Sequence, residues 1–482
     1  MDFNLPLIQV VVEYWMLLVP LLLHGLGILF IFDVLMNGRT SQGTIAWVMA
    51  LFFFPYLAVF LYLMFGARRI QDYAASHQSG TTDIRHLGKK LRQNGELRRF
   101  MVCETPQIDV LSDIYQLPAM KGNRCSLLID GTVTFDSILQ GISEAKRYIM
   151  VQFFIIHADG LGNRLKKALI ERARAGVRVY FLYDKVGSVR LTRSYIDDLK
   201  SAGVQVGIFG VGRGWLNRFR INFRNHRKIV VVDGKKSWVG GHNVGDEYLG
   251  MSHRFSRWRD THVKMEGPVT LGVQLSFVED WHWACGNLPE ASWDPPPAYG
   301  SERVLCIPTG PGDIVESGSL MMVQAINAAT RRCWMFSPYF VPDVAVIKAL
   351  QLAAMRGVDV RILIPANPDK RVVWWAAHSY LFDVALAGVR MYTYRDGFMH
   401  QKVFLIDDSL AGIGTANLDN RSLRINFEIT MAFTDSDFIR RVETMCLEDF
   451  ARSDPLTTDD VYRRSLMFRL AIRTARLFSP IL

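Results

Sequence analysis

Two short stretches of the chain combine a histidine, a lysine and an aspartate at one spacing that suits chemistry on a phosphate ester. The stretches FRNHRKIVVVDG and MHQKVFLIDDS both contain the pattern H-x-K-x-x-x-x-D. The residues are His226, Lys228 and Asp233 in the first copy, and His400, Lys402 and Asp407 in the second. An imidazole can attack phosphorus or transfer a proton near neutral pH, and ammonium groups neutralise phosphoryl oxygens. Two copies that face each other would give one nucleophile and one general acid, so each motif is predicted to be half of a site.

The flanks of the two motifs also match, which argues against coincidence. Each motif leads into a Gly-rich turn that carries an asparagine, GGHNVGDEY in the first copy and GTANLDNRS in the second. Asn243 lies seventeen residues after His226, and Asn417 lies seventeen residues after His400. At background composition, two independent copies of the pattern are expected in about one chain in a thousand.

The spacing of each motif indicates how a strand would present it. Side chains alternate along a strand, so His226 and Lys228 can point together into a cleft. The run Ile229–Val232 continues as a buried strand, and the aspartate then begins a turn. Asp233 and Asp407 complete the motifs, but strand parity leads us to expect an orienting or structural role for them rather than direct contact with the substrate.

The sequence predicts two similar series of helices and strands, and each series positions one of the motifs. Three segments that combine helices and strands precede each motif: 142–156, 161–184 and 202–210 in the first half, and 326–342, 346–365 and 387–395 in the second. Alternating helices and near-continuous apolar strands imply sheets with helices on both faces. The predicted fold class is therefore α/β, with two similar halves of mixed sheets flanked by helices.

Two apolar stretches near the N-terminus predict a membrane anchor. Tyr14–Phe32 has nineteen residues and Ile45–Phe65 has twenty-one, and neither contains a formal charge. At 1.5 Å per residue, each helix would span roughly the 30 Å of a hydrocarbon core. Arg68 and Arg69 follow the second stretch, and positive charge tends to stay in the cytoplasm. We expect a two-helix transmembrane hairpin that leaves both termini and the rest of the chain in the cytoplasm.

The net charge and the cysteine content limit the kinds of partner and cofactor that the chain is expected to bind. The formal charge is 56 − 46 = +10, which predicts an anionic partner, either nucleic acid or acidic lipid. The membrane spans favour lipid over nucleic acid. The six cysteines are scattered without a C-x-x-C pair, so reduced thiols are expected rather than zinc ligation or a disulfide framework. No His/Asp cluster has metal-ligand spacing, and neither a metal nor another cofactor is predicted.

The paired motifs with their trailing G-G/T-x-N turns resemble the phospholipase D superfamily. Within it, the chain is similar to the bacterial cardiolipin synthases over essentially its whole length. The segments that carry this second resemblance are the two membrane spans and the stretches DTHVKMEGP, SPYFVP, TANLDNRSL and INFEI. The resemblance implies a bacterial inner-membrane location.

The resemblance also implies roles for individual residues. His226 and His400 would be the catalytic pair, and four residues would line the phosphate: Lys228, Lys402, Asn243 and Asn417. In such enzymes an acidic residue holds the second histidine through its other ring nitrogen. Glu428 matches that place and is assigned to His400, while Asp260 is the corresponding acid of the first half.

The resemblance implies reversible phosphatidyl transfer between two phosphatidylglycerol molecules. One histidine, taken as His226, would attack the first lipid while His400 protonates the departing glycerol. The second lipid's terminal hydroxyl would then resolve a phosphatidyl-histidine intermediate to give cardiolipin. The sequence leaves open which histidine is the nucleophile and whether the chain forms oligomers.

Three other functions use the same features. A hydrolytic phospholipase D would release phosphatidic acid, and it differs only in the acceptor. A nuclease of the same superfamily would use the same histidines but would gain little from membrane spans. A non-catalytic binder of anionic lipid would need the charges but not the histidines.

The sequence also predicts domain boundaries and two lipid contacts. The boundaries are a transmembrane hairpin at 1–66, a cytoplasmic linker at 67–115, a first half at 116–300 and a second half at 301–482. The stretch 213–228 alternates Arg with apolar residues, as lipid-facing edges do. Near the C-terminus, a helical stretch separates Arg469, Arg473 and Arg476 from an apolar side, a pattern that fits either an interfacial helix or packing on the protein body.

Overall fold

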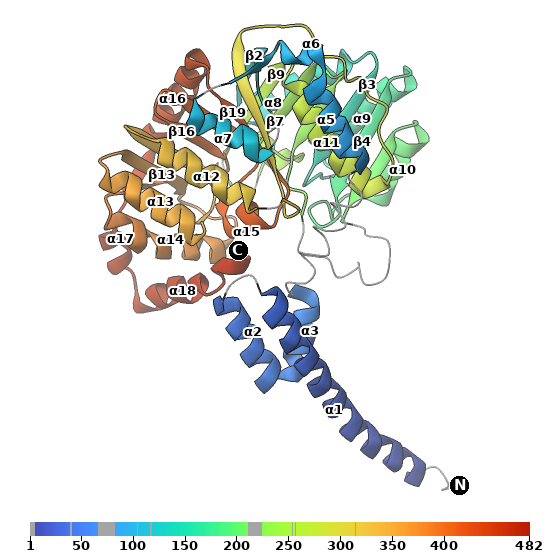
Figure 1. Ribbon diagram of the computed structural model, residues 1–482, viewed down its shortest axis with the longest axis vertical. Coiled ribbons are helices and arrows are strands. Elements are labelled where there is room, and N and C mark those ends of the chain that lie inside the picture. The colour runs from blue at the N-terminus through green and yellow to red at the C-terminus, as the bar shows by residue number, and fades with distance from the viewer. Residues whose placement is uncertain are drawn as a thin grey trace. The chain divides into compact units, whose positions relative to one another are not determined.

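The computed structural model describes most of the chain in two compact units. It describes residues 5–38, 41–65, 82–103, 105–115, 118–210, 224–252, 254–255, 257–313 and 315–482. One unit holds the described residues between positions 5 and 65, and the other holds the described residues between positions 82 and 482 (Figure 1). Residues 213–223 of the basic-aromatic stretch lie outside the described residues.

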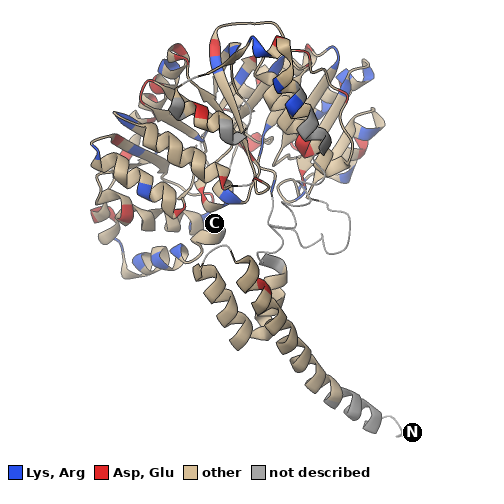
Figure 2. Cartoon of the chain, in the orientation of Figure 1, with Lys and Arg blue, Asp and Glu red and all other residues tan. Residues whose placement is uncertain are grey.

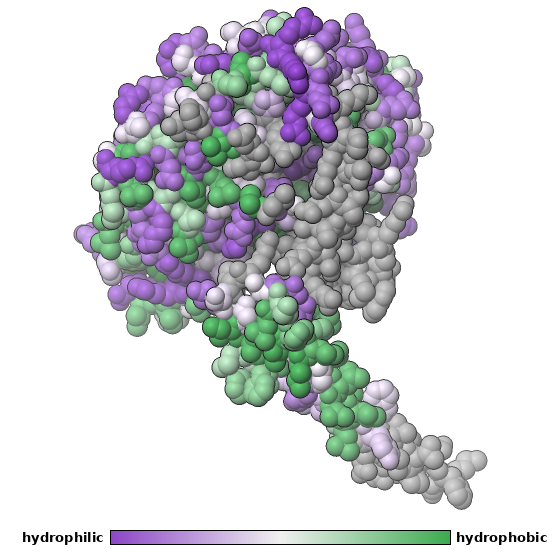
Figure 3. All heavy atoms as spheres, in the orientation of Figure 1, coloured by the Kyte–Doolittle hydropathy of each residue, from purple (hydrophilic) through white to green (hydrophobic). Residues whose placement is uncertain are grey.

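The first unit contains three apolar helices, α1 (Leu5–Asn37), α2 (Ser41–Phe53) and α3 (Pro55–Phe65). The second apolar stretch is divided between α2 and α3 because Pro55 has no N–H to continue the helical ladder. One described helix, Tyr14–Asn37, is long and apolar enough to cross a membrane. The three helices are nearly free of charged residues (Figure 2), and apolar side chains cover much of their surface (Figure 3). Asp33 is a charged exception, and its Oδ2 accepts a hydrogen bond from the Tyr62 hydroxyl at 2.7 Å.

The second unit contains a mixed sheet of sixteen strands within the described residues. The first half contributes β2 (Ala119–Ile129), β3 (Tyr148–Phe153), β4 (Arg178–Asp184), β5 (Gln205–Phe209), β6 (Ile229–Val232), β7 (Lys236–Gly240) and β9 (Thr261–Glu266). The second half contributes β10 (Glu302–Thr309), β11 (Arg332–Phe336), β13 (Asp359–Pro365), β14 (Arg390–Tyr394), β16 (Val403–Ile406), β17 (Leu410–Gly414) and β19 (Glu428–Phe433). The strands β1 (Met101–Val102) and β20 (Ser453–Leu456) complete the sheet.

The strand order shows that the two halves are built alike. The first half runs β5-β4-β3-β6-β7-β9-β2, and the second runs β14-β13-β11-β16-β17-β19-β10. In each half the first three strands of this order are parallel, and the following pairs are antiparallel. Strands β2 and β10 pair antiparallel and join the halves into one sheet. The structure confirms an α/β fold with a mixed sheet and two similar halves.

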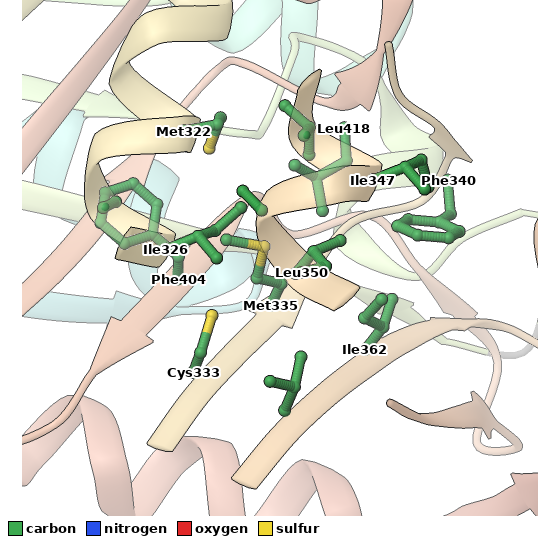
Figure 4. Packing of buried hydrophobic residues seen from close by; sticks show 14 of the residues in the cluster. Met322, Ile326, Cys333, Met335, Phe340, Ile347, Leu350, Ile362, Phe404 and Leu418 are labelled. Carbon is green, nitrogen blue, oxygen red and sulfur yellow. The ribbon is translucent and has the colours of Figure 1, made fainter. Parts of the chain in front are cut away.

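Helices cover both faces of the sheet, as alternation along β11 illustrates. Cys333 and Met335 point into a core that includes residues of α12 and α13 (Figure 4). Trp334 and Phe336 point to the opposite face and pack on the ring of Phe450 in α16. The helices of this unit are α5 (Thr82–Gln93), α6 (Gly95–Arg98), α7 (Pro106–Tyr115), α8 (Gly131–Ser143), α9 (Gly160–Arg174), α10 (Arg193–Ser201), α11 (Thr270–Cys285), α12 (Ser317–Ala328), α13 (Val344–Met355), α14 (Arg371–Ala385), α15 (Asn420–Arg424), α16 (Ser436–Ala451), α17 (Thr458–Tyr462) and α18 (Leu466–Arg476), with short 3-10 turns at η2 (Asp246–Leu249) and η3 (Ser479–Ile481).

Short pairings outside the main sheet also connect the halves. Strand β8 (Trp258–Arg259) of the first half pairs in parallel with β15 (Phe398–Met399) of the second. Asn225 and Phe427 form an isolated parallel bridge. A third two-stranded ribbon, β12 (Phe340–Val341) with β18 (Leu418–Asp419), lies within the second half. The two pairings between the halves lie next to the histidines of the two motifs.

The part of the chain predicted as a linker contains regular structure where it is described. Residues 82–115 form α5, α6, β1 and α7, and β1 pairs antiparallel with β2. This segment therefore belongs to the compact second unit. The domain boundaries themselves stay a prediction.

Candidate active site

The two histidines lie just before their strands and are held by backbone pairing with the other half. The His226 N–H donates to Phe427 O at 2.9 Å, and the His400 N–H donates to Arg259 O at 2.8 Å. Both side chains are buried. Each histidine therefore lies beside the next residue of the opposite half, which is Glu428 for His226 and Asp260 for His400.

This pairing exchanges the two carboxylates, which corrects the assignment made from the sequence. Glu428 was assigned to His400, but its Oε2 lies 2.9 Å from Nδ1 of His226. Asp260 of the first half instead approaches the second histidine, with Oδ2 at 2.7 Å from His400 Nδ1. The physical reason is the parallel pairing between halves: Asp260 follows β8 directly, and His400 follows β15.

The hydrogen bonds fix which ring nitrogen is free for chemistry. Nδ1 of His226 also lies 3.1 Å from Thr415 O, and a backbone carbonyl can only accept. His226 therefore carries its proton on Nδ1 and leaves a lone pair on Nε2. The Glu428 carboxylate is held in turn by Ser422 Oγ at 2.8 Å and Asn426 Nδ2 at 3.2 Å. The Asp260 Oδ1 accepts from the Thr261 N–H at 2.8 Å.

The motif lysines lie buried beside the histidines that precede them. Lys228 Nζ donates to His226 O at 2.6 Å, and Lys402 Nζ donates to His400 O. Burial lowers the pKa of Lys228 to about 7 and that of Lys402 to about 8. A phosphate in the site would restore their charged forms, because an opposite charge within a few ångströms favours ionisation.

Electrostatic coupling shows that both motifs belong to one site. Burial is the largest cause that lowers the pKa of His226, and Lys228 and Lys402 lower it further. The pKa of His400 is lowered by burial, by both lysines and by His226. Burial also raises the pKa of Glu428 to about 7, against the opposing effect of Lys228. Both imidazoles are therefore neutral near pH 7.

Aromatic rings enclose the two imidazoles. The Phe154 ring centroid lies 5.1 Å from that of His226. Around His400 lie Trp258 at 5.3 Å and Phe398 at 5.8 Å. Apolar walls of this kind exclude water and strengthen the interactions of charges within the site.

The two motif asparagines have different surroundings. Asn243 Oδ1 accepts from the Ile155 N–H at 3.1 Å, and its Nδ2 donates to the Tyr248 hydroxyl at 3.1 Å. Asn417 Oδ1 is buried and has no hydrogen-bond partner among the described residues. Asn417 therefore keeps part of its amide available, whereas Asn243 uses both ends to position its loop.

The motif aspartates lie at the far ends of β6 and β16, away from the histidines. Asp233 and Asp407 adopt positive φ angles of 55° and 48° at the turns that follow these strands. Asp233 accepts backbone N–H groups of residues 146–148, and Asp407 accepts those of residues 330–332. The structure does not bring these carboxylates to the reacting groups.

Sequence analysis missed the residue between the histidine and lysine of each motif. Arg227 donates to Glu428 O at 2.9 Å and to Asp280 Oδ1 at 3.0 Å. Gln401 donates to Asp449 Oδ2 at 2.8 Å, and Asp449 also pairs with Arg259. Strand alternation points these side chains opposite to the histidines. The sequence feature that could have revealed these two residues is a long polar side chain between two catalytic ones.

Among the described residues, no three His, Cys, Asp or Glu side chains lie together as metal ligands. The arrangement as a whole offers two imidazoles with free Nε2 atoms, two carboxylates that orient them and two lysines. Such a set can perform nucleophilic attack and proton transfer at one phosphate. The fold and this site define a phospholipase D-type enzyme.

Comparisons with known proteins agree with this class. A family model described as cardiolipin synthase, PLD-like domain, matches residues 138–254 and 322–449. A second, described as phospholipase D-nuclease N-terminal, matches residues 25–66. The chain is 47% identical over 467 residues to cardiolipin synthase A of Pseudomonas putida strain W619, covering 96% of this chain and 97% of the relative. It is 44% identical, with the same coverage, to cardiolipin synthase A of Pseudomonas fluorescens.

A solved structure supports the fold independently. The phosphatidylserine synthase of Haemophilus influenzae Rd KW20 aligns with a TM-score of 0.59 at 13% identity, over 79% of this chain and 100% of that one. The chain belongs to the cardiolipin synthase family of the phospholipase D superfamily, and it is an enzyme of the phosphatidyltransferase type.

Proposed function

We propose that the enzyme transfers a phosphatidyl group from one phosphatidylglycerol to the terminal hydroxyl of another, giving cardiolipin and glycerol. The observation that carries the proposal is the reciprocal arrangement of the site. Each histidine is oriented by a carboxylate of the other half, and the charges of both motif lysines act on both histidines. Family membership supports phospholipids as the substrates.

The first step forms a covalent intermediate. His226 Nε2 attacks phosphorus, and the bond from phosphorus to the glycerol oxygen breaks. His400, protonated in the complex by virtue of the phosphate charge and Asp260, gives its Nε2 proton to the departing oxygen. Glu428 stabilises the cationic ring that His226 becomes, because its carboxylate accepts a hydrogen bond from the Nδ1–H group.

The second step reverses these roles at His400. Neutral His400 takes the proton from the terminal hydroxyl of the second phosphatidylglycerol, and that oxygen attacks phosphorus. The phosphorus–nitrogen bond breaks, and His226 returns to its neutral form. The same group acts as acid and then as base, as microscopic reversibility requires. Lys228, Lys402 and the Nδ2 group of Asn417 donate to the phosphoryl oxygens throughout.

A product assay tests this function directly. Purified protein and labelled phosphatidylglycerol in detergent micelles, with a chelator present, are expected to give cardiolipin and free glycerol. His226→Ala and His400→Ala are expected to give neither. Phosphatidic acid as the main product would instead identify a hydrolase with the same site, and wild-type rates in both variants would refute the mechanism.

We infer that α1 and the α2–α3 segment form a two-pass hairpin and that the catalytic unit lies in the cytoplasm of a bacterial cell. The family match over residues 25–66 and the basic residues after position 67 support this topology. A cysteine at Ser41, in a Cys103→Ser background, is expected to react with a membrane-impermeant maleimide in intact spheroplasts. Cys103 of the wild type is exposed and is expected to react only after lysis. Labelling of both under the same condition would refute the hairpin.

The C-terminal helix α18 supports a further lipid contact. Ile472 and Ala475 are buried, whereas Met467, Leu470, Arg469 and Arg473 are exposed. Basic residues are visible along this helix in Figure 2. One face thus packs on the protein body, and the other offers apolar and basic groups to an acidic lipid surface.

A further inference from the structure

The proposed transfer leaves one anionic group without a partner. The acceptor lipid carries its own phosphate, which stays attached and charged while its terminal hydroxyl reacts. That phosphate cannot share the catalytic position, which the donor phosphate occupies. A cation beside the site must therefore hold it. This inference rests on the proposed function.

Lys370 lies at the edge of the site, on the loop 366–370 between β13 and α14. Its Nζ lies 5.3 Å from the ring centroid of Tyr339. Tyr339 directly precedes β12, and β12 pairs with β18. The residue before β18 is Asn417 of the second motif. The loop is thus placed near Asn417, to which the proposed function gives a contact with the phosphate.

The charges of this loop reach both catalytic histidines. Lys370 is among the groups that lower the pKa of His226, after burial and the two motif lysines. Asp369 acts on His400 from the same loop and opposes the lowering of its pKa by burial and the lysines. The charges of the loop are therefore close enough to both imidazoles to act on them.

Lys370 differs from the motif lysines because its ammonium group is accessible to a ligand. Its side chain is exposed, and no carboxylate lies within ion-pair distance of its Nζ among the described residues. The neighbouring Asp369 is engaged elsewhere: Oδ2 accepts from the Tyr339 hydroxyl at 2.6 Å, and Oδ1 accepts from the Lys370 N–H at 2.7 Å. Lys228 and Lys402, by contrast, are buried and bonded to backbone carbonyls.

The first half holds this loop of the second half in place. The Arg254 guanidinium donates to the carbonyl oxygens of Pro368 and of Asp369, the latter at 3.1 Å. A loop that is already ordered loses less entropy when it binds a ligand. Lys370 is therefore presented on a fixed support at the rim of the site.

We propose that Lys370 binds the phosphate of the acceptor phospholipid and thereby favours a lipid hydroxyl over water or a small alcohol. A charge-assisted contact to a phosphate selects for acceptors that carry one. A neutral alcohol gains nothing from this contact, although it can still attack the phosphatidyl-histidine intermediate.

The test compares two acceptors in one reaction. Wild-type full-length enzyme receives labelled phosphatidylglycerol in micelles together with ethanol, so that cardiolipin and phosphatidylethanol form from the same intermediate. Lys370→Ala is expected to lower the ratio of cardiolipin to phosphatidylethanol roughly 10- to 100-fold, the size of a lost hydrogen bond between charged groups. Lys370→Arg is expected to restore most of the ratio.

Lys348→Ala supplies the matched control. Lys348 is an exposed lysine on α13 whose Nζ donates to Gln351 Oε1 at 3.0 Å, and its loss is expected to leave the ratio unchanged. An unchanged ratio in Lys370→Ala, or an equal fall of both products, would overturn the proposal. If the wild type made phosphatidylethanol but no cardiolipin, the proposed function would fail first and this inference with it.

Discussion

At the scale of single residues, the exchanged carboxylates explain how two similar halves produce one site. Glu428 and Asp260 each lie within 2.9 Å of a histidine from the other half. A carboxylate on Nδ1 keeps the imidazole in the tautomer whose Nε2 can react, and it stabilises the imidazolium that forms. Neither half can therefore complete its own histidine.

Loss of either carboxylate is expected to slow the reaction. Glu428→Gln and Asp260→Asn should each lower kcat roughly 10²- to 10⁴-fold with little change in KM, because an amide can neither fix the tautomer nor stabilise the cation. Steady-state assays of cardiolipin formation give both constants. A rise in KM at unchanged kcat would show that these residues bind substrate instead.

The partner of each carboxylate can be separated by a burst experiment in the His400→Ala background. A phosphatidyl ester of p-nitrophenol needs no general acid, so His226 alone can release nitrophenolate. Adding Glu428→Gln is expected to slow this burst, whereas adding Asp260→Asn is expected to leave it unchanged. The opposite pattern would mean that His400, not His226, is paired with Glu428, or that the nucleophile is not His226.

At the scale of elements, the motif aspartates stabilise the turns after β6 and β16. Asp407 accepts hydrogen bonds from the Thr330 N–H and hydroxyl and from the N–H groups of Arg331 and Arg332, each at 2.8 Å. Its φ of 48° adds a cost for any replacement that is not Gly or Asn. The carboxylate thus joins the end of β16 to the start of β11.

Asp407→Ala is expected to lower the free energy of unfolding by roughly 2–4 kcal/mol, from unmatched backbone donors and the positive φ. The activity of each folded molecule should stay near that of the wild type. The neighbouring Asp408 is exposed and pairs with the exposed Arg331 and the partly buried Arg332, so Asp408→Ala should change stability by less than about 1 kcal/mol. Thermal unfolding and active-site-normalised rates check both variants. A catalytic defect in stably folded Asp407→Ala would contradict this role.

Helix α14 contains a histidine whose burial makes stability depend on pH. His378 Nδ1 lies 2.8 Å from Trp374 O, and burial lowers the pKa of His378 to about 4. An unfolded histidine binds its proton near pH 6.5. Below that pH the unfolded chain holds more protons than the folded one, so stability falls as pH drops from 6.5 towards 4.

The substitution His378→Gln removes the contribution of this group to the pH dependence of the free energy of unfolding. Between pH 7 and pH 5 the wild type is expected to lose about 2 kcal/mol more stability than the variant, since 1.5 pH units of a single proton give that amount. Denaturant or thermal unfolding at the two pH values measures the difference. Equal losses in both proteins would show that His378 is protonated in the folded state.

Much of the element order could be predicted from the sequence, because it depends on local patterns. The repeated helix-and-strand segments, the strand Ile229–Val232 and the turns at the aspartates all depend on neighbouring residues. The exchange of Glu428 and Asp260 depends on two distant contacts, the pairing of β8 with β15 about 140 residues away and the bridge between Asn225 and Phe427, and no local pattern encodes either of them. The buried roles of Arg227 and Gln401 were missed for the same reason, since their partners come from distant helices.

At the scale of the whole catalytic unit, buried polar contacts hold the two halves in register. Arg259 of the first half donates to both carboxylate oxygens of Asp449 in α16, at 2.8 and 2.7 Å. Gln401 donates to the same carboxylate, and Arg259 also donates to Asp260 O. The Arg259–Asp449 pair thus supports the pairing of β8 with β15, which brings Asp260 to His400.

Breaking this pair is expected to destabilise the unit and misplace Asp260. Asp449→Asn and Arg259→Met should each lower the free energy of unfolding by about 3–5 kcal/mol, because Arg259→Met leaves a buried carboxylate unpaired and Asp449→Asn leaves Arg259 only the more distant Asp130 at 3.5 Å. The double variant leaves no unpaired charge, so its loss should be clearly smaller than the sum of the two single losses. A double-mutant cycle from denaturant unfolding measures this coupling. Additive losses would mean that Arg259 and Asp449 do not stabilise each other, and that the other contacts between the halves, such as the pairing of β2 with β10, set the register.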